Sequence, residues 1–220
     1  MDDKALNAIL TGPESRVLGS LMEKQMTTPD YYPLTLKALT SACNQKSSRT
    51  PVMCLSDSEV AGIVSSLRTQ GLVTTRMDGR ADRFEQHLSR KLGITTKERA
   101  VLCVLMLRSA LTLNEIRINT GRMIEFDSNE DVQGALDALI KRDDALVIRI
   151  PRSAGQREDR FAQLLCGEVD IEPPAGTSSV SPGSGGTRDR IDRLESEVEA
   201  LKVELQGLRE LIEGRTPSSN

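Results

Sequence analysis

Apolar residues in the first three quarters of the chain recur at the three- and four-residue spacing of helices that bury one face. One such stripe predicts a helix over 14–26. It begins with Glu14 and continues with the apolar residues Val17, Leu18, Leu21 and Met22. It recurs residue for residue as Glu98, Val101, Leu102, Leu105 and Met106. A second landmark, Arg-x-Asp-Arg-Phe at 80–84, recurs at 157–161. Because unrelated domains would rarely share two landmarks in the same order, the sequence predicts an internal duplication.

The first copy is predicted to contain two further helices. We expect the second over 33–45, since Pro33 suits a first helical position. The third should begin after Ser56, because Ser56 and Glu59 form a capping box, and it should end at Gly71. The apolar face of this third helix consists of Val60, Ile63, Val64 and Leu67.

A β-hairpin is predicted after these three helices. The segment 72–75 has the residue types of a short strand, Asp78-Gly79 is a turn signal, and a returning strand carries Phe84. Three helices followed by a two-stranded hairpin make a winged helix-turn-helix. The hairpin loop of such a module is called its wing.

The second copy follows the same plan with different loops. Thr95 or Thr96 is expected to cap its first helix, Leu113–Thr120 to form the second, and Ser128 to cap the third. The third helix should bury Val132, Leu136 and Leu139, and strands are expected at 146–150 and 160–165. The predicted fold class is therefore mainly α with small β-hairpins. It comprises two tandem winged helix-turn-helix modules, at 12–88 and 93–168, and a C-terminal coiled-coil helix.

The repeated Arg-x-Asp-Arg-Phe segment has two readings. In the structural one, Phe84 and Phe161 fill the core of each module and Asp82 or Asp159 pairs with a neighbouring arginine. In the functional one, the arginines around the wings are exposed and contact phosphates. The phenylalanines and aspartates favour the first reading, and the arginines fit either.

The C-terminal quarter of the chain has a different composition. Residues 169–187 are rich in Pro, Gly, Ser and Thr, which is typical of a flexible linker. A heptad repeat then spans 188–214, and its seam consists of Ile191, Leu194, Val198, Leu201, Leu205, Leu208 and Ile212. Mostly β-branched residues at a with Leu at d favour a parallel two-stranded coil, which predicts a homodimer. The alternative is a single amphipathic helix that docks on the rest of the chain.

Composition and charge limit the chemistry that the chain can support. Aromatic residues make up 2%, the net charge is −3 and the pI is about 5.4, which argues against general coating of nucleic acid. The four cysteines include no C-x-x-C pair, and His87 is the single histidine. The sequence also has no Gly-rich phosphate loop and no nucleophile elbow. We therefore expect a non-enzymatic binding protein with no cofactor and no metal. With no membrane segment or leader in the sequence, a cytoplasmic location is the corresponding expectation.

Several runs resemble the YceH-like family of bacterial proteins. They are Glu23-Lys24-Gln25, Thr27-Thr28-Pro29, Tyr32-Pro33-Leu34, Ala42 to Lys46, Arg49, Pro51-Val52, Arg122-Met123, Glu125-Phe126 and Gly167-Glu168-Val169. The resemblance covers almost the whole chain. It implies tandem winged helices and a bacterial cytoplasm. It does not point to any particular biochemical activity. Ile124 departs from the pattern, because an aromatic residue is usual there.

Two hypotheses for function follow from this fold. The first is DNA binding, with a transcriptional regulator as the corresponding role, and contacts to phosphates from the loop before the third helix and from both wings. Its candidate residues are Asn44, Gln45, Lys46, Arg49, Arg68, Arg76, Arg80, Arg152 and Arg157. Asn44 and Gln45 have a structural alternative, since they could satisfy the end of the second helix.

The second hypothesis is a protein-interaction adaptor. The third helices begin with acidic residues (Asp57 and Glu59, then Glu130 and Asp131) where DNA readers usually present Arg, Asn, Gln or Lys. The aromatic pair Tyr31-Tyr32 would suit a protein contact, although Tyr32 could equally pack under the first helix. A protein partner is therefore the alternative to DNA.

Overall fold

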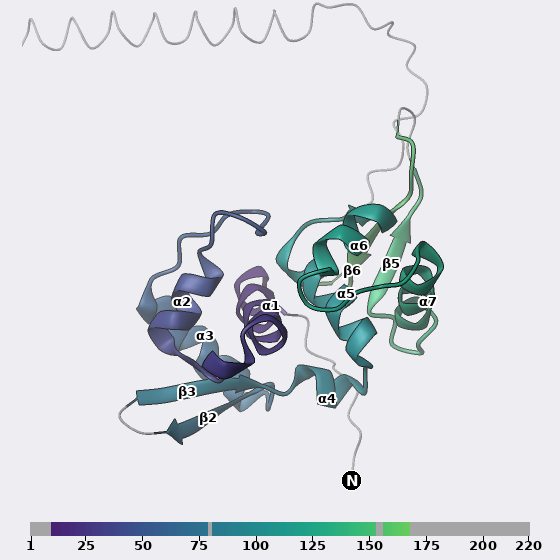
Figure 1. Cartoon of the computed structure of the whole chain (residues 1–220). Helices are drawn as coiled ribbons and strands as arrows, with labels where there is room; N and C mark the ends of the chain where they lie inside the picture. The colour runs from purple at the N-terminus through teal and green to yellow at the C-terminus, as the bar shows by residue number, and fades with distance from the viewer. Residues whose placement is uncertain (1–9, 79–80, 153–155, 168–220) are drawn as a thin grey trace, which may run out of the picture. The chain divides into compact units, whose positions relative to one another are not determined.

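Two segments of the chain fold into the same succession of helices and strands (Figure 1). The computed structural model describes residues 10–78, 81–152 and 156–167. The N-terminal repeat contains α1 (Gly12–Thr27), β1 (Leu34–Thr35), α2 (Leu36–Cys43), α3 (Asp57–Thr69), β2 (Val73–Asp78) and β3 (Ala81–Gln86). The C-terminal repeat contains α5 (Thr96–Leu107), β4 (Leu111–Thr112), α6 (Leu113–Thr120), α7 (Asn129–Ile140), β5 (Val147–Ile150) and β6 (Arg160–Gln163). A 3-10 turn, η1 (Pro29–Tyr31), follows α1, and α4 (Leu88–Leu92) lies between the repeats in sequence.

Each repeat builds a three-stranded antiparallel sheet around one phenylalanine. The strand orders are β1-β3-β2 and β4-β6-β5. Phe84 pairs with Leu34 on one side and Thr75 on the other, and Phe161 occupies the equivalent central position. Both phenylalanines are buried. The prediction that they fill the core is confirmed.

The helix starts follow from capping chemistry. Thr11, Ser56, Thr95 and Thr112 each cap a helix in a capping box with a glutamate three residues on, and Ser128 caps α7. The predicted caps at Ser56, Thr95 and Ser128 are confirmed. Gly71 ends the α3 region with a φ of 68°, a conformation that favours glycine.

The second helix, predicted over 33–45, begins later than expected, at Leu36. Pro33 follows a cis peptide bond and precedes the short strand β1, and Thr35 caps α2 at Leu36. Strands β1 and β4, with two residues each, were not predicted. Two residues are too few to show the alternation of a strand.

The first helices of the two repeats pack against each other. The apolar residues of the stripes predicted on α1 and α5 are buried, and every residue from Ala100 to Leu107 is buried. At Gly19 a Cβ atom would lie 3.0 Å from a Leu107 side-chain carbon, and the Cys103 thiol donates to the Gly19 carbonyl at 3.3 Å. Gly19 therefore allows a close approach of α1 and α5, so the two repeats share a core.

The predicted linker and coiled coil, 169–187 and 188–214, lie outside the described residues. No helix in the described part of the chain is long and apolar enough to cross a membrane.

Candidate nucleic-acid interface

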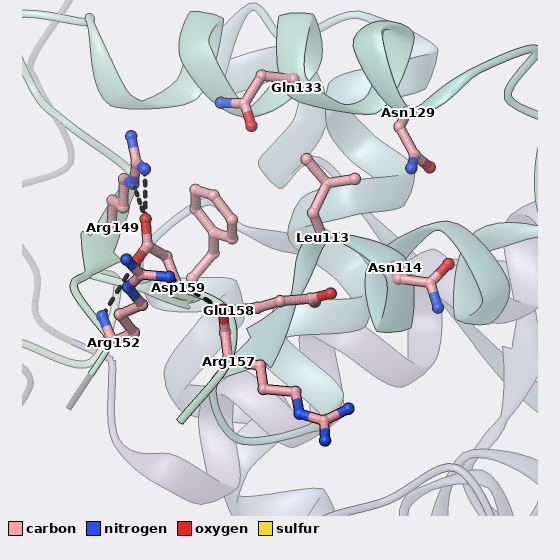
Figure 2. Close-up of a pocket in the computed structure, with 10 residues that line it drawn as sticks. Leu113, Asn114, Asn129, Gln133, Arg149, Arg152, Arg157, Glu158 and Asp159 are labelled. Carbon is pink, nitrogen blue, oxygen red and sulfur yellow. Dashed lines mark hydrogen bonds and ion pairs between the residues drawn. The ribbon is translucent and has the colours of Figure 1, made fainter. Parts of the chain in front are cut away.

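A groove of about 460 Å³ lies in the C-terminal repeat between α6, α7 and the β5-β6 hairpin (Figure 2). We call it the helix–wing groove. Its lining residues are Leu113, Asn114, Asn129, Gln133, Arg149, Arg152, Arg157, Glu158, Asp159 and Phe161. The groove thus combines the second and third helices of the repeat with its β5-β6 hairpin.

Side-chain amides line the helical side of this groove. Asn129 and Gln133 lie one turn apart on α7, and Asn114 lies in the first turn of α6 (Figure 2). The Asn129 amide oxygen accepts a hydrogen bond from Arg117 at 3.1 Å, and the Gln133 amide nitrogen donates to Asp137 at 2.7 Å. Amides on a helix are the groups that bind adenine edges in pairs of hydrogen bonds.

Arginines line the other side of the groove. Arg149 forms an ion pair with Asp159, whose second oxygen accepts the backbone N–H of Arg152 at 2.9 Å. These hydrogen bonds, from the Arg152 backbone first and the Arg149 side chain next, lower the pKa of Asp159. The prediction that Asp159 pairs with a neighbouring arginine is confirmed. Arg152 and Arg157 are exposed, and among the described residues no carboxylate lies within 4 Å of either guanidinium group.

The acidic start of α7 does not block this groove. Asp131 forms an ion pair with Lys97 of α5, and neither Asp131 nor Glu130 lines the groove. The acidic residues at the start of α7 therefore lie outside the groove, and the groove side of α7 presents amides.

The equivalent groove of the N-terminal repeat is more apolar. It has a volume of about 590 Å³ and is lined by Thr35, Leu36, Lys37, Ala61, Val64, Ser65, Arg68, Ala81, Asp82 and Phe84. Of the predicted contact residues, Arg68 lines this groove. Arg76 is exposed and pairs with Glu85 at 2.6 Å, whereas Arg80 lies outside the described residues.

The loop before α3 contains a predicted contact residue that is buried. The Arg49 side chain has no exposed surface, pairs with Glu23 at 2.6 Å and donates to the Ala42 carbonyl. Arg49 therefore holds the loop to α1 and α2 and cannot reach a phosphate. Asn44 is also structural, because its amide bonds both the carbonyl and the N–H of Leu55, at 2.7 and 2.8 Å.

Arg16 is a buried arginine that the sequence did not reveal. It is 2% exposed, and its guanidinium donates to the carbonyls of Cys43 at 3.1 Å and Pro51 at 2.6 Å. Arg16 and Arg49 thus hold the two sides of the loop after α2. In a sequence pattern, a basic residue beside an apolar stripe indicates an exposed position, so no signal pointed to this role.

The two tyrosines near η1 differ in exposure. Tyr31 is 75% exposed, whereas the Tyr32 hydroxyl accepts the backbone N–H of Gln86 at 2.7 Å. Tyr32 is thus partly buried against the core, and its hydroxyl contacts the backbone of β3.

Comparison with known proteins identifies the family. The profile of the DUF480 family, described as a protein of unknown function, matches residues 10–156. The chain belongs to this family. Its DUF480 relatives carry the name UPF0502, and the YceH-like group is the same family, so the resemblance is confirmed.

Three relatives show how far the likeness extends. A UPF0502 protein of Vibrio atlanticus is 40% identical over 94% of this chain and 99% of its own length. One of Burkholderia ambifaria is 44% identical over 90% of this chain and 81% of its own length. A third, of Mesorhizobium japonicum, is 42% identical over 91% of this chain and 96% of its own length. The family thus spans nearly the whole chain.

Proposed function

We propose that this DUF480 protein is a non-enzymatic DNA-binding protein built of two winged-helix modules, and that it acts as a transcriptional regulator. The helix–wing groove of the C-terminal repeat supports this proposal. It combines amides on α6 and α7 with arginines on the wing, facing the same groove. In a winged helix the third helix enters the major groove and the wing meets the backbone.

Each side of the groove has its own task in this proposal. Asn129 and Gln133 read base edges, where a well-placed pair of hydrogen bonds discriminates by about 1–3 kcal/mol. Arg152 and Arg157 contact phosphates, which position the protein and supply most of the salt-dependent affinity. Asp159 holds Arg149 and the Arg152 backbone, so it orients the wing.

Charge reversal on the wing tests this proposal. We expect Arg152→Glu and Arg157→Glu each to weaken binding to random genomic duplex fragments about tenfold and to reduce the slope of log affinity against log salt by about one. Arg90→Glu on α4 carries the same change in charge away from the groove and should bind as the unchanged protein does. Fluorescence anisotropy at low and physiological salt measures all four proteins. If the unchanged protein does not bind at low salt, the proposal is wrong.

The N-terminal repeat favours a second candidate function, a protein-interaction adaptor. Five of the ten side chains that line its groove are apolar, including Leu36, Val64 and Phe84. Tyr31 and Met77 of the same repeat are 75% and 91% exposed. A repeat with these surfaces suits a protein partner better than phosphates, and absence of DNA binding in the titration would make this candidate the leading one.

The heptad over 188–214, which lies outside the described residues, supports a homodimer. We expect Leu201→Asp to yield a folded monomer, because a charge at a d position is incompatible with the apolar seam. Val203→Asp, at the outward f position of the same heptad, should remain a dimer. Sedimentation equilibrium distinguishes the two masses. A dimeric Leu201→Asp variant would place the interface elsewhere.

A further inference from the structure

A third groove, with a volume of about 540 Å³, lies where the two repeats meet. We call it the inter-repeat groove. It is lined by residues of α1, the loop after α2, the end of α5 and the end of α6: Glu23, Lys24, Thr27, Gln45, Lys46, Ser47, Ser48, Arg108, Ile118, Asn119, Arg122 and Met123. Two predicted contact residues, Gln45 and Lys46, therefore lie beside residues of the other repeat.

The lining of this groove has an excess of positive charge. Four cationic side chains line it (Lys24, Lys46, Arg108 and Arg122), and Glu23 is the carboxylate among the lining residues. Glu23 already pairs with Arg49 at 2.6 Å, and it lies 3.7 Å from Lys24. Within the described part of the chain, no carboxylate lies within 4 Å of Lys46, Arg108 or Arg122. The groove thus holds cations that the protein itself does not neutralise.

Arg108 is the cation whose position is least explained by the fold. Its side chain is half-buried, and burial, together with the charges of Arg49 and Arg122, lowers its pKa, which Glu23 offsets only in part. A half-buried guanidinium without a partner is costly, and an anion that enters the groove would remove that cost. The planar guanidinium of arginine can also donate two parallel hydrogen bonds to a pair of phosphate oxygens.

We propose that the inter-repeat groove binds a phosphate group. Arg108 and Arg122 supply paired hydrogen bonds from the C-terminal repeat, and Lys46 supplies charge from the N-terminal one. Gln45, Ser47 and Ser48 add neutral donors on the loop side. The site depends on both repeats, because neither alone gathers these groups.

The phosphate has two possible sources, a free phosphorylated molecule or the DNA backbone. A groove of this volume is large enough for a nucleotide-sized ligand. Helix α6 connects the two grooves, since Asn114 in its first turn lines the helix–wing groove and Asn119 near its end lines this one. Eight helical residues span about 12 Å, so one duplex could also contact both grooves.

Calorimetric titration with pyrophosphate, at constant ionic strength, tests the site on the full-length protein. We expect the unchanged protein to bind, and Lys46→Glu and Arg122→Glu each to weaken binding about tenfold, the effect of losing one charge-assisted phosphate contact. Both residues are exposed and unpaired within the described chain, so the variants should fold. Arg90→Glu is the charge-matched control and should bind normally. No binding at millimolar pyrophosphate, or unchanged affinity in both variants, would refute the site.

The source of the phosphate follows from the DNA affinity of the same variants. If Lys46→Glu and Arg122→Glu also weaken DNA binding, and pyrophosphate competes with DNA, the site holds the backbone. If their DNA affinity is unchanged, the site holds a free phosphorylated molecule. The readout is independent of the proposed DNA function, because Arg152→Glu should lose DNA affinity and keep pyrophosphate affinity.

Discussion

Replacing Arg49 by methionine should lower the free energy of unfolding by about 3–5 kcal/mol, the usual effect of removing one partner from a buried ion pair. The Arg49 side chain has no exposed surface, and that of Glu23 is 13% exposed. The substitution would leave the Glu23 carboxylate without its cation and would also remove the donors to the Ala42 carbonyl. Chemical denaturation followed by circular dichroism measures the change.

The same pair should make stability depend on pH. Burial by itself would raise the pKa of Glu23, but the hydrogen bond and charge of Arg49 outweigh it and hold the pKa below its ordinary value of 4.5. Because the pKa is lower in the folded protein, the stabilisation is present above the unfolded value and is lost as pH falls through the folded one. The loss of stability on acidification below about pH 4.5 should therefore be smaller in Arg49→Met.

A surface ion pair provides the control for this experiment. Lys141 pairs with Asp137 on α7, and their side chains are 76% and 43% exposed. Lys141→Met should change the free energy of unfolding by about 0.5 kcal/mol or less, because exposed pairs contribute little. The double variant Glu23→Met/Arg49→Met should be more stable than Arg49→Met, since it leaves no unpaired charge. If Arg49→Met costs no more than the control, the pair does not hold the loop.

Local sequence rules were sufficient to predict most helices of each repeat. Ser56, Thr95 and Ser128 predict helix starts because a cap depends on residues only three positions away. The stripes on α1 and α5 predict buried faces for the same reason. The repeated phenylalanine predicts a core position, and both copies are buried.

The candidate sites were less predictable because they depend on contacts between distant residues. Arg49 and Lys46 are similar in sequence context, yet one is buried against Glu23 and the other lines a groove. Asn129 and Gln133 become candidate contact residues only because the β5-β6 hairpin packs opposite α7 and forms a groove with them. Arg108 and Arg122 had no reason to be grouped with Lys46 until α1 and α5 brought the repeats together. Burial and charge pairing decide each case, and neither is visible in the order of residues.

Valine in place of Gly19 should destabilise the protein by about 1–3 kcal/mol, the usual cost of overpacking a core. Even a single Cβ would lie 3.0 and 3.1 Å from two Leu107 side-chain carbons and 3.2 Å from Cβ of Met106. The two further methyl carbons of valine cannot fit unless α1 and α5 move apart. Thermal unfolding measures the stability change.

Gly62→Val on α3 is the matched control, because a Cβ at Gly62 meets nothing within 4 Å. It should shift stability by only a few tenths of a kcal/mol, since both residues are modest helix formers. Separation of α1 from α5 would also move Lys24 relative to Arg108, so Gly19→Val should weaken pyrophosphate binding while Gly62→Val does not. A Gly19→Val protein as stable as the control would mean that the two helices are not closely packed, and the inter-repeat groove would then lose its structural basis.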